Sequence, residues 1–302
     1  MTQMLKSMLR RLPPIAQLIA LRKLIRANGF VPPGHFYSPV VSIDEVRRDE
    51  QRVFHRWNNS PKGINMNEAG QLELLGHFEA IYPSVDFPSE KAESHRYHYE
   101  NPAYSYSDAI MLHCMMRHFK PSKIIEVGSG YSSCAILDTR ERHFDGNVEV
   151  TFIEPFPKLL LSLIRPSDRE SVEIVPTRLQ DVPIEKFRGL QSGDFLFVDS
   201  THVSKTGSDV NYLFFDVLPA LNAGVHIHIH DIFYPFEYPK EWVMGGRSWN
   251  ELYVLRAFLQ FNNAFSISMM NTYLERFHKP RLASKMPLCL KNTGGSIWIY
   301  KK

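Results

Sequence analysis

The chain has 302 residues, 44% of them hydrophobic and 22% charged, and its formal net charge is +3. This composition is typical of a globular protein, and so small a charge for this length gives no indication of nucleic acid as a partner. The three cysteines, Cys114, Cys134 and Cys289, are too few and too scattered for a disulfide framework or a zinc cluster. We therefore expect a reduced, cytoplasmic protein.

The first 25 residues have the pattern of a short basic amphipathic helix. Met1–Arg11 is basic, and Ile15–Ile25 has helically spaced apolar residues interrupted by Arg22 and Lys23. No small-residue cleavage site of the kind that ends a signal peptide follows, and no stretch is long and apolar enough to span a bilayer. We expect this helix to pack on the protein or on a second subunit of a homo-oligomer. The alternative is peripheral contact with an anionic membrane surface.

The rest of the chain up to about residue 100 is irregular. Gly29–Pro39 is rich in proline and aromatic residues, whereas Val41–Trp57 and Ala69–Tyr82 have the apolar spacing of amphipathic helices. We predict that residues 1–100 form a mostly helical extension that acts as a cap or contacts substrate or another subunit. Residues 101–302 then form the main domain.

From about residue 105, strand and helix patterns alternate along the chain. The predicted strands are Lys123–Val127, Val148–Ile153, Val172–Val175, Asp194–Asp199, Val225–His230, Phe265–Met269 and Ser296–Tyr300. The predicted helices are Ser107–Phe119, Tyr131–Thr139, Pro157–Ile164, Asp209–Leu221 and Trp249–Phe261. This alternation predicts an α/β fold, a parallel sheet with helices on both faces. Irregular chain between the last two strands predicts a C-terminal antiparallel hairpin.

A glycine loop joins the first predicted strand to its helix. Gly128 and Gly130 permit a tight turn and a close approach to a ligand, and the helix beyond offers free N–H groups. A dinucleotide fingerprint needs a third glycine where this chain has Ser133. The carboxylate of Glu126 beside the loop suits a cationic ligand better than a diphosphate. The loop therefore favours a nucleotide-like cofactor other than NAD.

An acid follows the next predicted strand. Glu154 lies roughly 20 residues beyond the loop, where an acid of this kind of fold accepts hydrogen bonds from ribose hydroxyls. The simpler alternative is a plain tight turn at Gly128 and Gly130 with a solvated acid at Glu154. The combination resembles motif I and the ribose-binding acid of class I methyltransferases that depend on S-adenosylmethionine (SAM). The alternation from about residue 105 resembles that family's Rossmann-like fold, a seven-stranded sheet with a final antiparallel strand.

The resemblance implies a SAM site in three parts. The loop would line the methionine half of SAM, Glu154 would bind the ribose, and Gln180 with Asp181 would contact adenine. Pro102–Asp108 lies where the family often folds a segment over the cofactor. The loop residues concerned are Glu126, Gly128, Ser129, Gly130 and Tyr131.

Polar motifs follow the fourth and fifth predicted strands. Asp199 and His202 follow the fourth, and His230 and Asp231 follow the fifth. Ligands bind beyond the carboxyl ends of parallel strands, so these groups should approach one another. They resemble the magnesium site of metal-dependent O-methyltransferases of catechols and sugars, but an imidazole here suits zinc, iron, manganese or nickel better. We predict Asp199, His230 and Asp231, or His202 in place of His230, as ligands of a divalent metal. The alternative is that both aspartates act without metal.

The alternating histidines of the fifth strand cannot all share one ion. His226, His228 and His230 lie on one face, and the first and last are separated by about 13 Å. We therefore expect His226 and His228 to be interior residues. Methyl transfer to a hydroxyl requires loss of a proton, for which His202 is the first candidate base and His230 the second, with Asp199 beside them. The alternative for His202 is that it caps a loop.

The segment Phe233–Trp242 is rich in aromatic residues and proline, and it follows Asp231 directly. Such a segment could wall a pocket for a sugar or a polar ring, with packing as the alternative for Phe236 and Trp249. We predict a SAM-dependent methyltransferase acting on oxygen of a small-molecule or carbohydrate-like acceptor. A nitrogen acceptor is the first alternative. An NAD-dependent oxidoreductase and a non-catalytic SAM-binding protein are the others.

Overall fold

A computed structural model describes residues 15, 17–20, 22–23, 29–55 and 60–302. Most of the predicted N-terminal helix therefore falls outside the described residues. The chain divides into two compact units, Met1–Asn58 with Pro239–Ser248 and Asn59–Tyr238 with Trp249–Lys302. Among the described residues, no helix has both the length and the apolar character that a membrane span requires.

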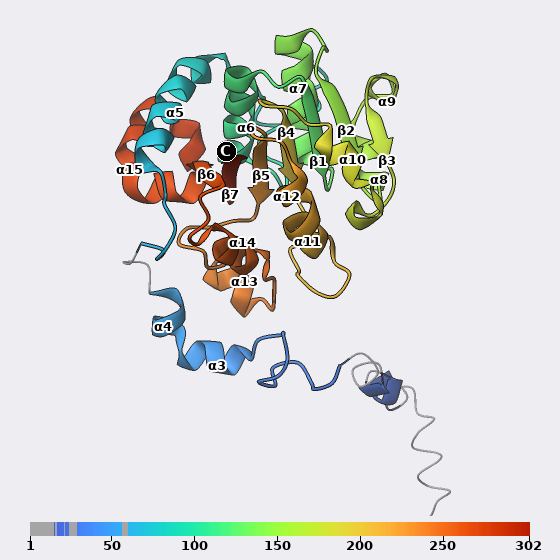
Figure 1. Cartoon of the computed structure of the whole chain (residues 1–302), viewed down its shortest axis with the longest axis vertical. Helices are drawn as coiled ribbons and strands as arrows, with labels where there is room; N and C mark the ends of the chain where they lie inside the picture. Colours follow the sequence, from blue (N-terminus) through green and yellow to red (C-terminus); the bar gives the residue numbers. More distant parts are fainter. Residues whose placement is uncertain (1–14, 16, 21, 24–28, 56–59) are drawn as a thin grey trace, which may run out of the picture. The chain divides into compact units, whose positions relative to one another are not determined.

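A seven-stranded sheet forms the centre of the larger unit, with the order β3-β2-β1-β4-β5-β7-β6 (Figure 1). The first five strands are mutually parallel, and β7 runs antiparallel to both β5 and β6. The parallel sheet and the antiparallel last strand are thus confirmed. The strands are β1 Lys123–Val127, β2 Glu149–Ile153, β3 Glu173–Val175, β4 Phe195–Val198, β5 His226–His230, β6 Phe265–Met270 and β7 Ser296–Lys301.

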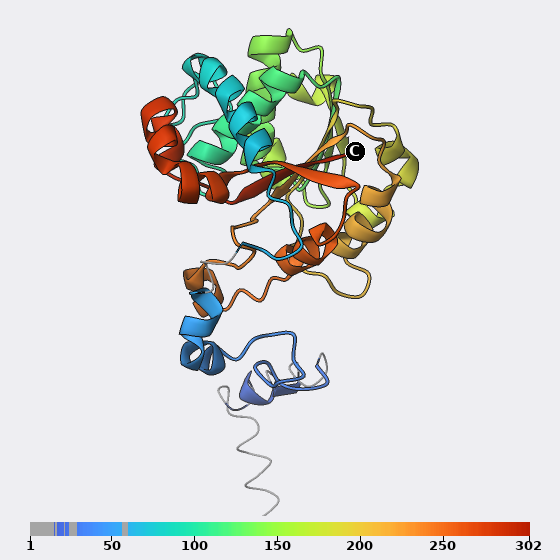
Figure 2. The same cartoon turned by 60° about the vertical axis from the view of Figure 1, so that its left-hand side comes forward.

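Helices cover both faces of this sheet (Figures 1 and 2). The central strands β4 and β5 are buried along their whole length; β4 is apolar on both faces, whereas β5 has its three histidines on one face. The α-helices of this unit are α5 Glu68–Ile81, α6 Tyr106–Phe119, α7 Tyr131–Phe144, α8 Lys158–Leu163, α9 Asp168–Ser171, α10 Ile184–Arg188, α11 Asp209–Tyr212, α12 Leu218–Ala220, α14 Glu251–Leu259 and α15 Asn271–Lys285. Short helical turns lie at Tyr82–Ser84, Leu179–Asp181 and Pro287–Leu290.

Two predictions about helices were wrong. The chain between β6 and β7 is not irregular, because it contains α15. Pro280 lies inside α15, and His278 has non-helical backbone angles. Because proline disfavours a helix interior, the sequence of α15 does not have a clear helical pattern. The single helix predicted over Asp209–Leu221 is interrupted by a π-helical turn at Leu213–Val217.

Within residues 29–55 and 239–248, the smaller unit contains the short helices α3 Ile43–Arg48, α4 Glu50–Phe54 and α13 Lys240–Met244. The predicted helix over Val41–Trp57 is therefore divided near Asp49, within the part of it that is described. Ser42 caps α3 by accepting a hydrogen bond from the backbone of Glu45. In the larger unit, α5, which belongs to the predicted extension, packs on α6 and β6. The functional boundary near residue 100 stays a prediction.

Candidate active site

The glycine loop lies where the carboxyl ends of β1 and β4 meet. Gly128 has φ +77°, and a Cβ atom added to it would lie 1.9 Å from the carbonyl oxygen of Asp199. Its N–H donates to the carbonyl of Ile153, while the N–H of Asp199 donates to that of Val127. Only glycine combines this left-handed conformation with so close an approach. The first glycine of the motif is thus required by the packing of β1 against β4.

Glu126 supports the loop from within the core. Its carboxylate accepts hydrogen bonds from the hydroxyls of Ser132 (2.6 Å) and Ser133, and Ser133 Oγ in turn accepts from the N–H of Gly130 (3.0 Å). Burial raises the pKa of Glu126 to about 8, although both serine bonds oppose this shift. The residue that replaces the third glycine of a dinucleotide motif therefore links the loop to Glu126.

Glu154 is held just beyond the end of β2. Its carboxylate oxygens accept hydrogen bonds from the backbone N–H groups of Ser129 (3.2 Å) and Phe156 (2.7 Å). These bonds fix the acid beside the glycine loop. The contact between Ser129 and Glu154 thus connects the ends of the first and second strands.

A cavity of about 460 Å³ opens beside these strand ends. This volume is in the range of small-molecule and cofactor sites. Its wall contains four of the predicted cofactor residues, namely Gly128, Glu154, Gln180 and Asp199. The other predicted cofactor residues, Glu126, Ser129, Gly130, Tyr131 and Asp181, are not part of this wall.

Asp199, His202 and Asp231 form a cluster at the carboxyl ends of β4 and β5. One ligand atom from each residue lies within 4.8 Å of the others. The Nε2 atom of His202 lies 3.2 Å from Asp199 Oδ1 and 3.4 Å from Asp231 Oδ2. His202 and Asp231 have φ values of 59° and 56°, which are unusual for residues other than glycine. Strained backbone of this kind is concentrated at functional sites.

Glu251, at the start of α14, fixes the orientation of His202. Its Oε2 lies 2.9 Å from His202 Nδ1 and accepts a hydrogen bond from Ser200 Oγ (2.8 Å). Glu251 is completely buried. This role could not be predicted from the sequence, because Glu251 lies 49 positions after His202 and belongs to no local motif. The only hint was an acid at the start of a predicted apolar helix.

The surrounding carboxylates favour the protonated form of His202. Burial lowers the pKa of this imidazole, but its hydrogen bonds to Asp199 and Glu251 outweigh burial and raise the pKa to about 10. The pKa of Asp199 is correspondingly lowered by the nearby histidines, against the effect of its own burial. Without another cation, an imidazolium at His202 therefore neutralises part of the cluster's negative charge.

The same residues fit a divalent cation. Two carboxylates and one imidazole form a mixed oxygen and nitrogen donor set, which suits manganese, iron or zinc better than magnesium. Glu251 at Nδ1 leaves Nε2 of His202 facing both carboxylates, and a carboxylate in this position is a common partner of a metal-binding histidine. Of the two sets predicted from sequence, the closest grouping is the one with His202.

His230 lies beside the cluster but is not one of its three members. Its Nε2 is 3.7 Å from Asp231 Oδ1, and its ring is next to Tyr104. His226 and His228 are both buried, and His228 stacks on Phe197 at 3.9 Å. The prediction that these two histidines are interior residues is confirmed.

Aromatic residues surround the cluster on the side of α14. The ring of Trp249 lies 4.3 Å from that of His202, and Tyr238 lies 6.2 Å from Trp249. Phe236 is completely buried, so packing is its role. Trp249, in contrast, contacts the ring of a candidate catalytic residue.

Comparison with known proteins places these features in a family. Residues 125–232, from β1 to just beyond β5, match a family described as a methyltransferase domain. An uncharacterised protein of Archaeoglobus fulgidus is 32% identical over 164 residues, which cover 53% of this chain and 73% of that protein.

Two solved structures were also found to be similar. An SAH-bound methyltransferase of Podospora anserina has a TM-score of 0.41 and 17% identity, covering 91% of this chain and 99% of that one. The SAM-bound O-methyltransferase TomG of Streptomyces achromogenes has a TM-score of 0.41 and 16% identity, covering 79% and 92%.

The matched segment therefore makes the chain a methyltransferase, an enzyme whose cofactor is SAM. The NAD-dependent and non-catalytic alternatives are set aside.

Proposed function

We propose that the enzyme methylates a hydroxyl oxygen of a small, carbohydrate-like acceptor next to the carboxylate–histidine cluster. One observation carries this proposal: Asp199 lines the cofactor-sized cavity and also belongs to the cluster with His202 and Asp231. An acceptor bound by the cluster would lie against the cofactor, as transfer between two bound molecules requires.

Within the cavity, each part of the cofactor has a proposed partner. Glu154 accepts hydrogen bonds from the ribose hydroxyls, Gln180 contacts the adenine, and Gly128 with Asp199 lines the methionine half. SAM supplies the electrophilic methyl group. The residues outside the cavity wall, Glu126, Ser129, Gly130, Tyr131 and Asp181, stay predictions as direct cofactor contacts.

We further propose that Asp199, His202 and Asp231 hold a divalent cation. When bound, the cation supplies Lewis-acid stabilisation to a deprotonated acceptor hydroxyl. The chain's own contribution is positional, because Glu251 retains the Nδ1 proton of His202 and so directs Nε2 to the cluster. The predicted set of Asp199, His230 and Asp231 is less well supported, since His230 lies outside the closest grouping.

A metal-free form of the same reaction has support from the charges of the site. Its hydrogen bonds to Asp199 and Glu251 raise the pKa of His202 to about 10, which favours the protonated form and supports a role in charge neutralisation over the predicted role as base. In the metal-free form, Asp199 and Asp231 accept a hydrogen bond from the acceptor hydroxyl, and His230, the second candidate base, takes up its proton. The cation-bound form remains our main proposal because of the bond between Glu251 and Nδ1.

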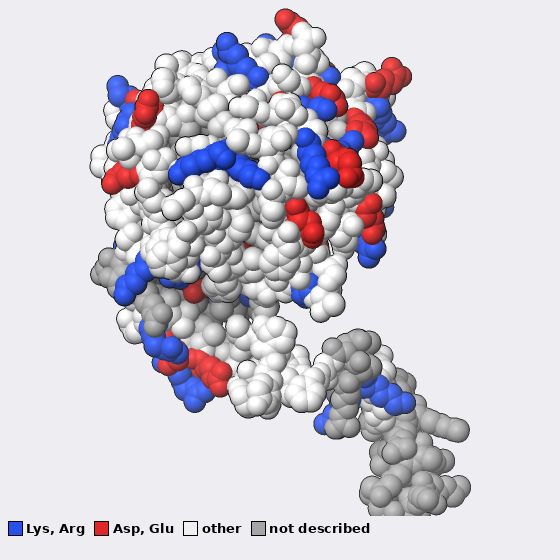
Figure 3. Space-filling view, viewed as in Figure 1, with Lys and Arg blue, Asp and Glu red and all other residues white. Residues whose placement is uncertain are grey.

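The surroundings of the cluster support a small polar acceptor. Carboxylates accept hydrogen bonds from several hydroxyls, and the ring of Trp249 beside His202 offers an apolar face. On the face in Figure 3, basic and acidic side chains of the described residues are intermixed, whereas a protein that binds nucleic acid typically has a basic stripe. A cytoplasmic location, a homo-oligomer and membrane contact of the N-terminal helix stay predictions.

Product analysis with the full-length protein tests the proposal. The protein is incubated with methyl-labelled SAM, cell extract and a panel of sugars and catechols, and products are identified by mass spectrometry. We expect an O-linked methyl group, loss of activity in EDTA and recovery with Mn²⁺. A product methylated on nitrogen would refute the oxygen acceptor, and full activity in EDTA would refute the metal-bound form.

Variants test whether the cluster holds the metal ion. Asp231→Asn should weaken Mn²⁺ binding about 10–100-fold while SAM still binds in calorimetry. The control is Asp216→Asn, which makes the same change at an exposed position outside the cavity and the cluster. Equal Mn²⁺ affinity in both variants would exclude Asp231 as a ligand.

A further inference from the structure

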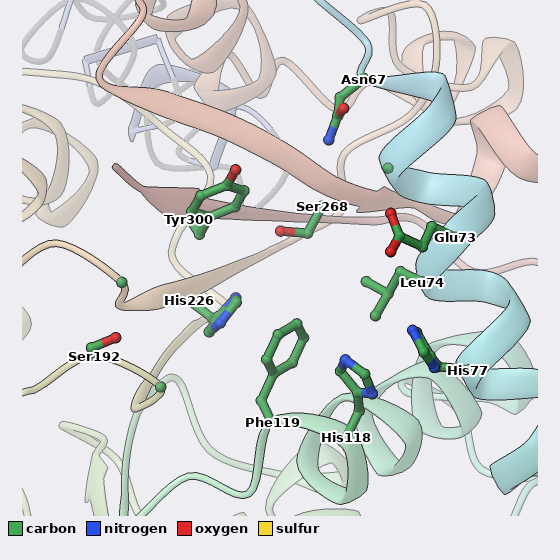
Figure 4. A pocket seen from close by; sticks show the side chains of 13 residues that line it. Asn67, Glu73, Leu74, His77, His118, Phe119, Ser192, His226, Ser268 and Tyr300 are labelled. Carbon is green, nitrogen blue, oxygen red and sulfur yellow. The ribbon is translucent and has the colours of Figure 1, made fainter.

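A second cavity lies at the opposite edge of the sheet. It has a volume of about 510 Å³ and opens where β4 and β5 begin, whereas the cluster described above lies where these strands end. Ser192, Gly193 and Gly224 come from the turns before the two strands. Figure 4 shows the strand side with His226 and Tyr300, and the facing wall of α5 with Glu73, Leu74 and His77. All of its lining residues belong to the larger unit.

Two buried polar atoms at this cavity lack a hydrogen-bond partner. They are His226 Nδ1 and Ser268 Oγ, for which no partner exists among the described residues. His226 is 8% exposed and Ser268 is 6% exposed, and both line the cavity. Buried polar groups are nearly always hydrogen-bonded, because an unpaired one destabilises the fold. These two atoms therefore indicate a ligand that supplies the missing bonds.

The charge of the wall limits what this ligand can be. Glu73 is the one residue with a formal charge among the described residues lining the cavity, where no lysine or arginine occurs. Burial lowers the pKa of His226 to about 4 and, together with the neighbouring His77, lowers that of His118. Both of these histidines are then neutral at pH 7, so neither supplies a positive charge that would neutralise an anion.

The shape of the wall favours a flat ligand. The rings of Phe119 and His226 lie 3.9 Å apart, and those of His77 and His118 lie 4.7 Å apart. Tyr300 lies 6.0 Å from His226 on the strand side. Aromatic faces of this kind pair with planar rings in stacked or edge-on arrangements.

We propose that this cavity is a second small-molecule site, separate from the SAM site, that binds a planar aromatic amide or amidinium. The ring of such a ligand packs on Phe119 and Tyr300. Polar groups of the ligand pair with His226 Nδ1 and Ser268 Oγ, since an imidazole nitrogen and a hydroxyl can both complement an amide. A cationic end is stabilised by Glu73 at the mouth.

Three probes of equal shape and different charge test this site. Benzamide is neutral, benzamidine is cationic and benzoate is anionic. Their binding to the full-length protein is measured by saturation-transfer NMR and calorimetry. We expect benzamide and benzamidine to bind and benzoate to bind at least tenfold more weakly. Absence of binding by all three, as for a cavity that holds only water, would overturn the proposal, and so would equal binding of benzoate.

Variants locate the binding. Ser268→Ala removes one unpaired atom, and His226→Phe removes the other while keeping a ring. Each should weaken benzamide binding at least fivefold, whereas Ser162→Ala at an exposed position of α8 should not. SAM affinity should be unchanged in all three, which shows that they are folded and keeps this test independent of the methyltransferase mechanism. Unchanged benzamide binding in both cavity variants would overturn the proposal.

Discussion

The parallel strands β4 and β5 have a functional feature at each end. The carboxyl edge of the sheet, where these strands end, and the amino edge, where they begin, differ in charge. The carboxyl edge brings two aspartates and His202 within 4.8 Å of one another and supports them with the buried Glu251. The amino edge instead has neutral histidines and two buried polar atoms without partners among the described residues. The first edge can neutralise a cation and polarise a hydroxyl, whereas the second can only complement a neutral or cationic ligand. Parallel strands thus give one molecule two chemically different ends.

The largest effect is expected where the carboxyl edge is most closely packed. Gly128→Ala should lower the free energy of unfolding by about 2–5 kcal/mol, because it combines left-handed strain with a clash against the Asp199 carbonyl. SAM binding should be lost with it. Urea denaturation and calorimetry measure the two effects. Gly146→Ala is the control, since Gly146 has a similar φ of +74° with nothing within 4 Å, and it should cost only about 1–2 kcal/mol. Equal losses would show that the clash is absent.

A smaller effect on stability and a clear one on activity are expected at Glu251. Glu251→Gln should reduce turnover or Mn²⁺ affinity about 10–100-fold, because His202 loses the carboxylate that orients it. SAM affinity should not change, since Glu251 is not part of the cavity wall. NMR should also show a lower pKa for His202, which a purely structural role would not produce. Glu90→Gln, at an exposed site, is the control. Wild-type turnover in Glu251→Gln would contradict the positioning role.

The sequence predicted the carboxyl edge better than its internal geometry. The alternation of strands and helices and the polar residues at strand ends follow from local patterns, and β1 was predicted at its observed bounds. His202, and not His230, belongs to the cluster, and His202 has a left-handed backbone that no sequence pattern indicates. Glu251 and α15 were missed because the first acts across a long sequence separation and the second has a weak apolar repeat.

The amino edge was not predicted at all. Its cavity is formed by turns before β4 and β5 together with α5, which was predicted to belong to a separate extension. Packing between segments so distant in sequence leaves no signal in a single chain. His226 was correctly expected to be interior, but its unpaired Nδ1 could be found only in three dimensions.

The pH dependence of stability distinguishes the two edges further. Glu126 has a usual pKa of 4.5, which burial raises to about 8, so the folded protein retains this proton while the unfolded chain loses it. The contribution of protonated Glu126 to the free energy of unfolding is therefore fully present below pH 4.5. It is lost as the pH rises to about 8, by at most about 1.4 kcal/mol per pH unit. Glu126→Gln should remove this decline. Urea denaturation of both proteins at pH 5, 6.5 and 8 measures it, and parallel pH profiles would show that Glu126 ionises normally.

The smallest effect, of opposite sign, is expected at the amino edge. His226 has its pKa lowered from 6.5 to about 4 by burial, so the unfolded chain takes up a proton that the folded protein does not. Stability should fall as the pH falls from 6.5 towards 4, again by at most about 1.4 kcal/mol per unit, over a narrower window than for Glu126. His226→Phe should remove this fall in stability below pH 6.5, whereas His55→Phe, at an exposed position, should not.

If benzamide fills the cavity as proposed, it should stabilise the wild type more than His226→Phe at pH 7, because the bond to Nδ1 is available only in the wild type. Equal stabilisation of the two proteins would mean that the unpaired atom plays no part in binding, and that the two edges differ in charge but not in ligand chemistry.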